Sequence, residues 1–540
     1  MTEPPVVTEP PVVTEPVDPV VPTAPIGLGG MTLTASDVAN LANLVRGIAP
    51  PLAPGEEAAA IVGYRDLAGM ENNVDQPGLG AAGQPFLRLT DARYGVLDQA
   101  TGKNDLNTMF DGLDPRAISN IIGTQSAEVA PAADINTFFM AFGQYFDHGL
   151  SFIPKGGNGS VQIGAPGTSR PGVGIANNPA DLTRASIAGW DANGVPQHTN
   201  ITSPFVDQNQ VYGSSNLVGQ LLRASDGNQG FGANLVRGDI DPSNTAFTLL
   251  PNLRQILDHH IEAGTIFTGP TVAVGGETLL DYYPGLIVNG AYDPLVVKDL
   301  VSNFMGEGYP LLLDANPFIN LLDHVIAGDG RANENITLTS MHEIWSRNHE
   351  FHVANLEAAG FVGTPEELFQ AAKIVNEAEY QRVVFTEFAE KLLGGVGIRG
   401  TGDHGFGGYN PETDAGISHE FAAAAYRFGH TMVGDTVDIL NADGTTRSMT
   451  LFDAFLNPTS DEGAFTMPLS TLAQYGYVPQ PGYEQIGAGA ILGGIVGQAA
   501  EAVDVHMVDA IRNDLVRVSA DLFSFNVARG RDLGLGTLNQ

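Results

Sequence analysis

Three polar residues interrupt the apolar segment Phe139–Leu150, and their spacing could support acid–base chemistry. Gln144 and His148 lie four residues apart, so in a helix both project from one face. Asp147 would lie about 100° further round that helix. A neutral histidine beside an amide, on an aromatic wall, can act as a general base in a dry pocket. Taken alone, His148 fits a hydrogen-bonded core histidine better than a base, because single motifs often arise by chance.

Three later segments contain further polar groups in a fixed order. They are Ala327–Asn335 followed by Leu338–His342, then Ala425–Thr431, then Asp521–Asp532. With the first segment, they resemble four ordered motifs of the animal-type haem peroxidases, the peroxidase–cyclooxygenase superfamily. Four ordered motifs are more specific than one tripeptide. The resemblance covers almost everything from about residue 60 to the end of the chain, and it implies haem b as cofactor.

On the distal side, the resemblance assigns a base, an amide and a cation. His148 would move a proton between the two peroxide oxygens, and Gln144 would hold water or peroxide beside it. Arg331 would stabilise the departing oxygen, since a guanidinium stays charged at any working pH. The alternative for Arg331 is an ordinary surface salt bridge.

On the proximal side, the resemblance makes His430 the axial ligand of the haem iron. Asn526 would accept a hydrogen bond from the imidazole N–H and so fix its tautomer. Arg427 would pair with a haem propionate or with the segment around Asn526. The alternative for His430 is a buried structural histidine.

Two carboxylates match the positions that form ester bonds with haem methyl groups in this family. They are Asp147 and Glu334, so the resemblance implies covalently attached haem. Some relatives carry a methionine after the second carboxylate, which forms a third linkage. Here that position is Asn335, and we expect this linkage to be absent.

The segment around residues 203–214 resembles the calcium loop of the family. Ser203, Phe205, Asp207 and Asn209 would offer a hydroxyl, a backbone carbonyl, a carboxylate and an amide, which are ligands that hard cations accept. The family usually places another carboxylate directly after the distal histidine, whereas this chain has Gly149. We therefore expect weakened calcium binding, or help from another acid.

The implied function is a peroxidase that reduces hydrogen peroxide and oxidises small donors, namely phenols, Mn(II) or halides, through an oxyferryl intermediate. The sequence looks more like bacterial members, some of which oxidise Mn(II). One alternative is a fatty-acid dioxygenase of the cyclooxygenase branch, but its tyrosine three residues before the proximal histidine is replaced by Arg427, and Tyr426 lies four before. Another is a non-catalytic adhesion module that uses Arg237-Gly238-Asp239.

Composition limits the partners and the chemistry. The 540 residues include 61 acidic and 25 basic side chains, giving a net charge of -36, and no cysteine. Such a surface repels nucleic acid and anionic lipid and attracts cations. Disulfides and thiolate metal sites are excluded. No signal peptide is visible, and the longest apolar run, 486–500, is too short for membrane insertion. We expect an extracellular protein from the resemblance, and the oligomeric state stays open.

The chain divides into a tether and one catalytic domain. Residues 1–26 repeat Thr-Glu-Pro-Pro-Val-Val and favour a disordered, extended tether. Residues 27–540 show apolar spacing typical of helices and few strand patterns, which predicts a mostly α-helical haem peroxidase domain with long loops. Family domains run on beyond Asp532, so the chain is either truncated at its C-terminus or a shortened bacterial variant. The expected helices are 32–48, 134–148, 339–359, 365–393, 418–433 and 500–516, and a long glycine-rich loop is expected over 154–174.

Overall fold

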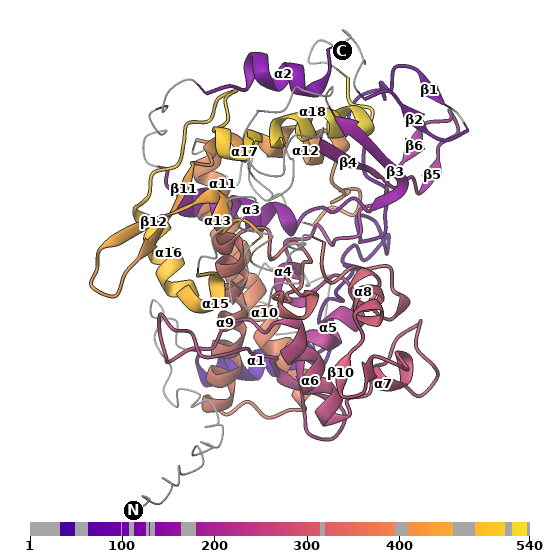
Figure 1. Ribbon diagram of the computed structural model, residues 1–540. Helices are drawn as coiled ribbons and strands as arrows, with labels where there is room; N and C mark the ends of the chain where they lie inside the picture. The colour runs from indigo at the N-terminus through magenta and orange to yellow at the C-terminus, as the bar shows by residue number, and fades with distance from the viewer. Residues whose placement is uncertain are drawn as a thin grey trace, which may run out of the picture.

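The computed structural model describes residues 33–48, 63–98, 100–106, 113–125, 129, 135–163, 180–313, 319–394, 409–456, 481–513 and 521–536. The predicted tether, residues 1–26, lies outside these ranges. Helices dominate the described residues, as predicted (Figure 1). They are α1 (Ala35–Val45), α2 (Pro115–Ile122), α3 (Thr137–His148), α4 (Asn209–Tyr212), α5 (Asn216–Leu222), α6 (Leu253–Ala263), α7 (Leu279–Tyr282), α8 (Pro294–Ser302), α9 (Ile336–Ala358), α10 (Pro365–Val383), α11 (Ala389–Leu392), α12 (His419–Ala423), α13 (Leu451–Ala454), α15 (Tyr483–Ile486), α16 (Ala488–Gly497), α17 (Asp509–Asn513) and α18 (Leu522–Asp532).

The strands of the described residues form only two-stranded antiparallel sheets. The pairs are β1 (Leu97–Asp98) with β2 (Lys103–Asn104), β3 (Lys155–Ile163) with β4 (Ala180–Ala185), β5 (Gly189–Trp190) with β6 (Pro196–Gln197), β7 (Arg223–Ser225) with β8 (Phe231–Leu235), β9 (Ile287–Val288) with β10 (Ala291–Tyr292), and β11 (Thr436–Leu440) with β12 (Thr446–Thr450). One large hydrophobic core draws side chains from Val38 in α1 through to Ile511 in α17. The scaffold of the site is therefore helical, and the sheets lie in its connections.

Helix α3 carries the first motif, and a helix cap and aromatic packing explain why it forms and how it is oriented. The Asn136 side chain accepts a hydrogen bond from the backbone N–H of Phe139 at 3.0 Å, which caps the helix. Its aromatic face packs on Phe388, whose ring centre lies 4.8 Å from that of Phe139 and 5.2 Å from that of Phe142. Phe388 ends a π-helical turn, η3 (Val384–Phe388), which joins α10 to α11. This packing fixes the orientation of α3 and hence of the polar residues at its end.

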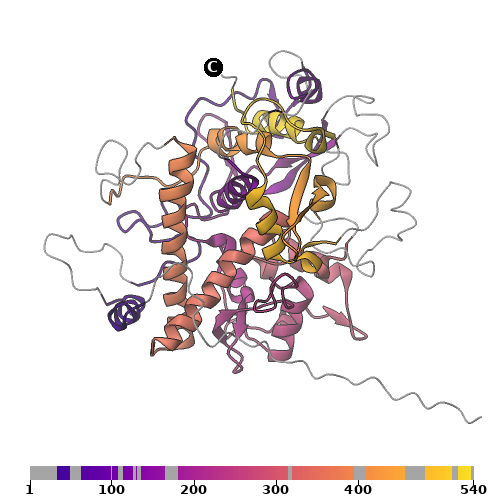
Figure 2. The same ribbon diagram turned by 90° about the vertical axis from the view of Figure 1, so that its left-hand side faces the viewer.

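The two longest helices, α9 and α10, pass through the middle of the molecule (Figures 1 and 2). Asn335 caps α9 by accepting from the backbone N–H of Leu338 at 2.9 Å. Thr364 and Glu367 form a capping box at the start of α10, where Pro365 occupies the first turn. The start of α9 follows Glu334 directly, so the second motif is held at the end of a long, buried helix.

Three expectations about local structure are wrong. The single helix expected over 418–433 breaks at Ala424 (φ −134°, ψ −67°) into α12 and a 3-10 segment, η4 (Ala425–Met432). Over 500–516, only α17 is helical among the described residues, because Ala500, Glu501 and Met507 donate backbone hydrogen bonds to Ile135, Met432 and Gly123 instead. The glycine-rich stretch 154–174, expected as a loop, contains β3, because its backbone pairs with β4.

The apolar run 486–500 forms most of helix α16, which packs inside the protein through Ile491 and Ile495. In the part of the chain that the structure describes, no helix has both the length and the apolar character needed to cross a membrane.

Candidate functional site

The distal residues meet at the end of α3, opposite the start of α9. The Gln144 amide donates to Glu334 Oε2 at 2.8 Å and accepts from the Asn335 amide at 2.9 Å. His148 Nε2 lies 3.5 Å from the same carboxylate oxygen. The structure therefore brings Gln144 and His148 together with Glu334, which follows them almost 200 residues later in the sequence. It also places Asn335 here, as the helix cap and as a partner of Gln144.

His148 is a buried and neutral imidazole. Its side chain is 6% exposed, and burial, followed by the positive charge of Arg331, lowers its pKa well below the ordinary value. Nδ1 lies 3.8 Å from Asp329 Oδ1 and has no partner within hydrogen-bonding distance. A neutral ring keeps a lone pair at neutral pH, so His148 can accept a proton there.

The guanidinium of Arg331 is already engaged by protein acceptors. Nε and Nη2 donate to the two oxygens of Asp329 at 2.9 and 2.7 Å. Nη1 and Nη2 also donate to the backbone carbonyls of Ser151 and His148 at 3.1 and 3.0 Å. Arg331 therefore ties the end of α3 to the second motif, a clamp that the sequence analysis did not foresee. Its predicted role as a free distal cation stays a prediction.

Asp329 is the functional candidate that the sequence analysis missed. It is 1% exposed, and the charge of Arg331 helps to hold its pKa far below the ordinary range despite burial. Its carboxylate also accepts from the backbone N–H of Arg331 at 2.9 Å, an aspartate turn that the Asp-Gly-Arg order could have signalled. The neighbouring Gly328 packs so closely that an added Cβ would lie 2.1 Å from the Asn209 carbonyl oxygen. Asp329 is thus fixed beside both Arg331 and His148.

The proximal residues meet between η4 and α18. The Asn526 amide nitrogen lies 2.8 Å from His430 Nδ1, and its oxygen accepts from Arg427 Nη1 at 3.0 Å. Our expectation that the amide oxygen would face the imidazole is therefore wrong for this structure, because Arg427 engages that oxygen. Burial, together with the charge of Arg427, lowers the pKa of His430 to about 3, so the imidazole is neutral.

The two sets of residues face one region. The charge of Arg427 interacts with the carboxylates of Asp147 and Glu334 on the distal side. Burial raises the pKa of Asp147 to about 6, against the opposing effects of Arg331 and Arg427. The Glu334 side chain is 26% exposed, although it lies at the start of a buried helix.

Small side chains leave open space beside the proximal histidine. No atom would lie within 4 Å of a Cβ added at Gly429, the residue before His430. Ala424 and Ala425 are exposed. An open face with small residues, a neutral imidazole on one side and two carboxylates on the other fits a flat haem group.

Of the four residues expected to bind calcium, Ser203, Asp207 and Asn209 are hydrogen-bonded to one another beside the end of α3. Ser203 donates from its hydroxyl to Asp207, and Asn209 donates from its amide to Asp207 Oδ1 at 3.2 Å. Phe205 lies in the same turn, but no contact links its carbonyl to the cluster. The same Asn209 amide donates to the carbonyl of Gly149 at 2.8 Å. The cluster is therefore connected by its own hydrogen bonds.

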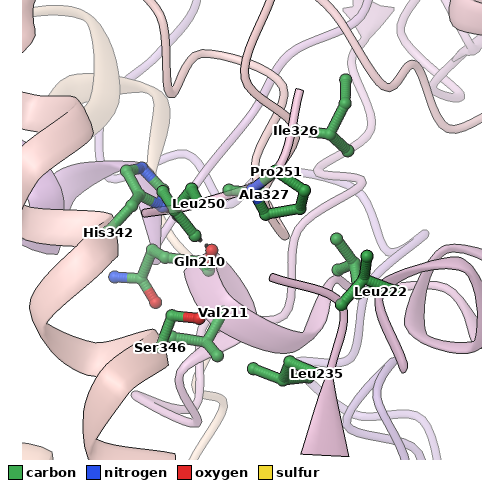
Figure 3. A pocket seen from close by; sticks show the side chains of 11 residues that line it. Gln210, Val211, Leu222, Leu235, Leu250, Pro251, Ile326, Ala327, His342 and Ser346 are labelled. Carbon is green, nitrogen blue, oxygen red and sulfur yellow. Dashed lines mark hydrogen bonds between the residues drawn. The ribbon is translucent and has the colours of Figure 1, made fainter. Parts of the chain in front are cut away.

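A small pocket is lined by residues of α4, α5, β8, α9 and neighbouring segments (Figure 3). Apolar side chains such as Val211, Leu235 and Leu250 line it, with Gln210 and His342 at one side. Its cavity volume of about 10 Å³ is roughly what one water molecule needs, and it is far below the range of about 300–1,000 Å³ usual for drug-sized ligands. His342 is held by the Gln210 carbonyl at 3.0 Å. We assign this pocket to core packing.

The adhesion alternative does not fit the geometry of Arg237-Gly238-Asp239. The Arg237 guanidinium points inward, where it pairs with Glu343 and donates to Ser346 Oγ at 2.6 Å and to the Thr248 carbonyl at 2.7 Å. An adhesion motif needs this cation on the surface, so the structure argues against that function.

Comparison with known proteins gives one consistent family. The family model described as animal haem peroxidase matches residues 64–253 and 315–540. Human thyroid peroxidase is 25% identical over 548 residues, covering 94% of this chain and 50% of that protein. Human probable oxidoreductase PXDNL is 26% identical over 406 residues, covering 70% of this chain and 23% of that protein. This chain spans half or less of the length of these relatives.

Solved structures share the fold at low identity. Peroxidase A from Dictyostelium discoideum matches with a TM-score of 0.62 and 20% identity, covering 87% of this chain and 76% of that one. The fatty acid alpha-dioxygenase of Oryza sativa matches with a TM-score of 0.52 and 15% identity, covering 93% and 71%. Likeness at this identity shows the fold alone.

Proposed function

Because the chain belongs to the animal haem peroxidase family, we propose that it is a haem-dependent peroxidase that reduces hydrogen peroxide and oxidises small donors. One observation carries this proposal. A buried neutral histidine, His148, stands beside Gln144 and Glu334 on one side of a common region, and the His430–Asn526 pair stands on the other. Haem, when bound between them, supplies the redox chemistry.

We further propose which residues hold the haem. His430 would be the axial ligand of the iron, and Asp147 and Glu334 would attach the group covalently through esters. Arg427 would turn to a propionate, which frees the amide oxygen of Asn526 to accept from the imidazole N–H. That change matters because an iron-bound imidazole carries its proton on the other ring nitrogen.

The distal residues would handle the proton of the peroxide. His148 accepts it at Nε2, the nitrogen that faces Gln144 and Glu334, and then returns it to the oxygen that leaves. Asp329 favours a proton on Nδ1, because its carboxylate is the nearest negative group on that side. A proton on Nδ1 leaves the lone pair on Nε2, where the base must act. Gln144 positions the peroxide, and the Arg331 charge favours the developing negative oxygen.

A fatty-acid dioxygenase is the second candidate, favoured by the shared fold with the rice alpha-dioxygenase. Such an enzyme needs a tyrosine that can form a radical close to the haem. Tyr426 is the nearest candidate in sequence, but its hydroxyl donates to the Gly143 carbonyl at 3.1 Å, against helix α3. Arg427 occupies the position three before the histidine. We therefore rank dioxygenation below peroxidation.

Absorption spectroscopy of the full chain, purified with haem, tests the proposal. We expect a ferric Soret band that shifts when peroxide is added. His148→Ala should keep the haem but slow this shift about 100- to 10,000-fold, the usual contribution of a general base, whereas His430→Ala should impair haem retention. A His148→Ala protein that reacts as fast as the wild type would refute the assignment of the base.

We also propose, from the resemblance, that the protein works outside the cell and is close to bacterial peroxidases that oxidise Mn(II). The net charge of -36 supports a cationic donor, since such a surface concentrates cations.

A further inference from the structure

The loop that matches the family's calcium site is held by an amide. Asn209 Nδ2 donates to the Ser203 carbonyl at 2.6 Å, to the Gly149 carbonyl at 2.8 Å and to Asp207 Oδ1 at 3.2 Å. Three oxygens from two separate segments thus converge on one nitrogen. Such convergence of carbonyl and carboxylate oxygens is how proteins usually surround a hard cation.

The charge of this cluster is low for a calcium site. Asp207 is its only carboxylate. Calcium affinity falls as the number of charged ligands falls. The cluster therefore lacks the charge that would favour a divalent cation over the amide.

The position of the missing second carboxylate is filled by another side chain. A Cβ added at Gly149 would lie 2.2 Å from Gln210 Nε2. That amide is fixed by hydrogen bonds to the Tyr145 carbonyl at 2.8 Å and to the Tyr380 hydroxyl at 2.9 Å. An acidic residue at 149 would therefore have to displace the Gln210 amide and break both of these hydrogen bonds. The absence of a carboxylate at position 149 and the presence of the buried Gln210 amide are therefore two parts of the same packing arrangement.

We propose that the Asn209 amide takes the place of the calcium ion, so that this loop stays folded without a metal. This replaces the calcium binding that the sequence predicts for Ser203, Phe205, Asp207 and Asn209. With the amide reversed, Asn209 Oδ1 would face three other oxygens, an arrangement that is stable only with a cation between them. A loop held by the Asn209 amide and a loop that binds calcium therefore differ in whether calcium changes the thermal stability of the protein. This difference can be measured without any enzyme assay.

The first experiment uses the wild-type full chain, dialysed against buffer with EGTA or with excess calcium. We expect less than one calcium per ten chains by elemental analysis in both cases. We also expect the same midpoint of thermal unfolding. One calcium per chain, whose removal by EGTA lowers the midpoint, would overturn the proposal.

The second experiment converts the amide into a ligand. Asn209→Asp removes the donor and adds a carboxylate, so its unfolding midpoint should fall in EGTA and rise again with calcium. The matched control is Asn333→Asp, which alters a buried amide outside the cluster, one that donates to the Val325 carbonyl at 2.8 Å. The control should be destabilised equally with and without calcium. An Asn209→Asp protein that calcium does not rescue would also overturn the proposal.

Discussion

Replacing Asp329 by asparagine should lower both the stability of the protein and the rate at which it reacts with peroxide. The carboxylate holds Arg331 through two hydrogen bonds and lies 3.8 Å from His148 Nδ1. Asparagine keeps the size of the side chain but removes its charge. Arg331 would then remain buried without its hydrogen-bonded anion, with Asp147 as the remaining negative group nearby, and His148 would lose the group that favours a proton on Nδ1.

The sizes of the two effects follow from the geometry. Unit charges at the 2.7 Å separation of Asp329 and Arg331 attract by on the order of 6 kcal/mol at an effective dielectric constant of about 20. Breaking a buried pair on one side costs about 3–5 kcal/mol, and we expect the lower end because asparagine still accepts a hydrogen bond. Misplacing a base that contributes about 100- to 10,000-fold should slow the peroxide reaction by about 10- to 100-fold.

The assay combines denaturant unfolding with stopped-flow measurement of the Soret shift after mixing with peroxide. The matched control is Asp241→Asn, because Asp241 is fully buried and pairs with Arg347 away from α3. Both variants should lose stability, Asp241→Asn by less because Arg347 keeps Glu343 as a second paired anion, but only Asp329→Asn should react slowly. If Asp329→Asn reacts at the wild-type rate while its stability falls, Asp329 holds Arg331 without positioning His148, and our reasoning about the tautomer is wrong.

Three further predictions concern pH, attachment and donor. The rate of the peroxide reaction should stay constant as pH falls through 6.5, because His148 acts unprotonated and its pKa lies below that of a free histidine; a rate that halves near pH 6.5 in a stopped-flow pH series would contradict this. Haem should resist acid–organic extraction from the matured wild type and be released from the Asp147→Ala, Glu334→Ala double variant, which mass spectrometry of digests can check. Mn(II) and small phenols should be better donors than bromide or iodide, and Mn(II) oxidation should weaken at higher ionic strength; steady-state rates that favour a halide at low salt would show that pocket chemistry outweighs the surface charge.

The sequence was sufficient to predict that Gln144 and His148 lie on one face of a helix, because the spacing within this motif is local. The start of α9 was expected at residue 339 and lies three residues earlier, at Ile336, because Asn335 caps the helix. The link between Arg331 and the carbonyls of α3 depends on contacts across about 180 residues, which no local pattern contains. The orientation of the Asn526 amide could not be predicted from the sequence either, because it depends on the hydrogen bond that Arg427 donates to the amide oxygen.

Within the described residues, most of one predicted helix is missing where the backbone forms hydrogen bonds with segments that are distant in the sequence. The apolar spacing of 500–516 suits a helix, but Met507 bonds to Gly123 and Glu501 to Met432. The break at Ala424 is equally invisible in composition, since alanine favours helix. Over 500–516, tertiary hydrogen bonds outweighed local preference.

The 3-10 winding of η4 has a consequence for the proximal histidine. With three residues per turn, positions three apart eclipse one another, so Arg427 and His430 stand in line along one edge and both reach Asn526. In an α-helix the same two positions would be offset by about 60°. The 3-10 segment also advances about 2.0 Å per residue instead of about 1.5 Å, so its eight residues reach further than one α-helical stretch would. The 3-10 winding of η4 thus sets both the direction in which the His430 imidazole points around the helix axis and its position along that axis. A change at the break near Ala424 that rewound η4 as α-helix would turn His430 away from Asn526 without altering either residue.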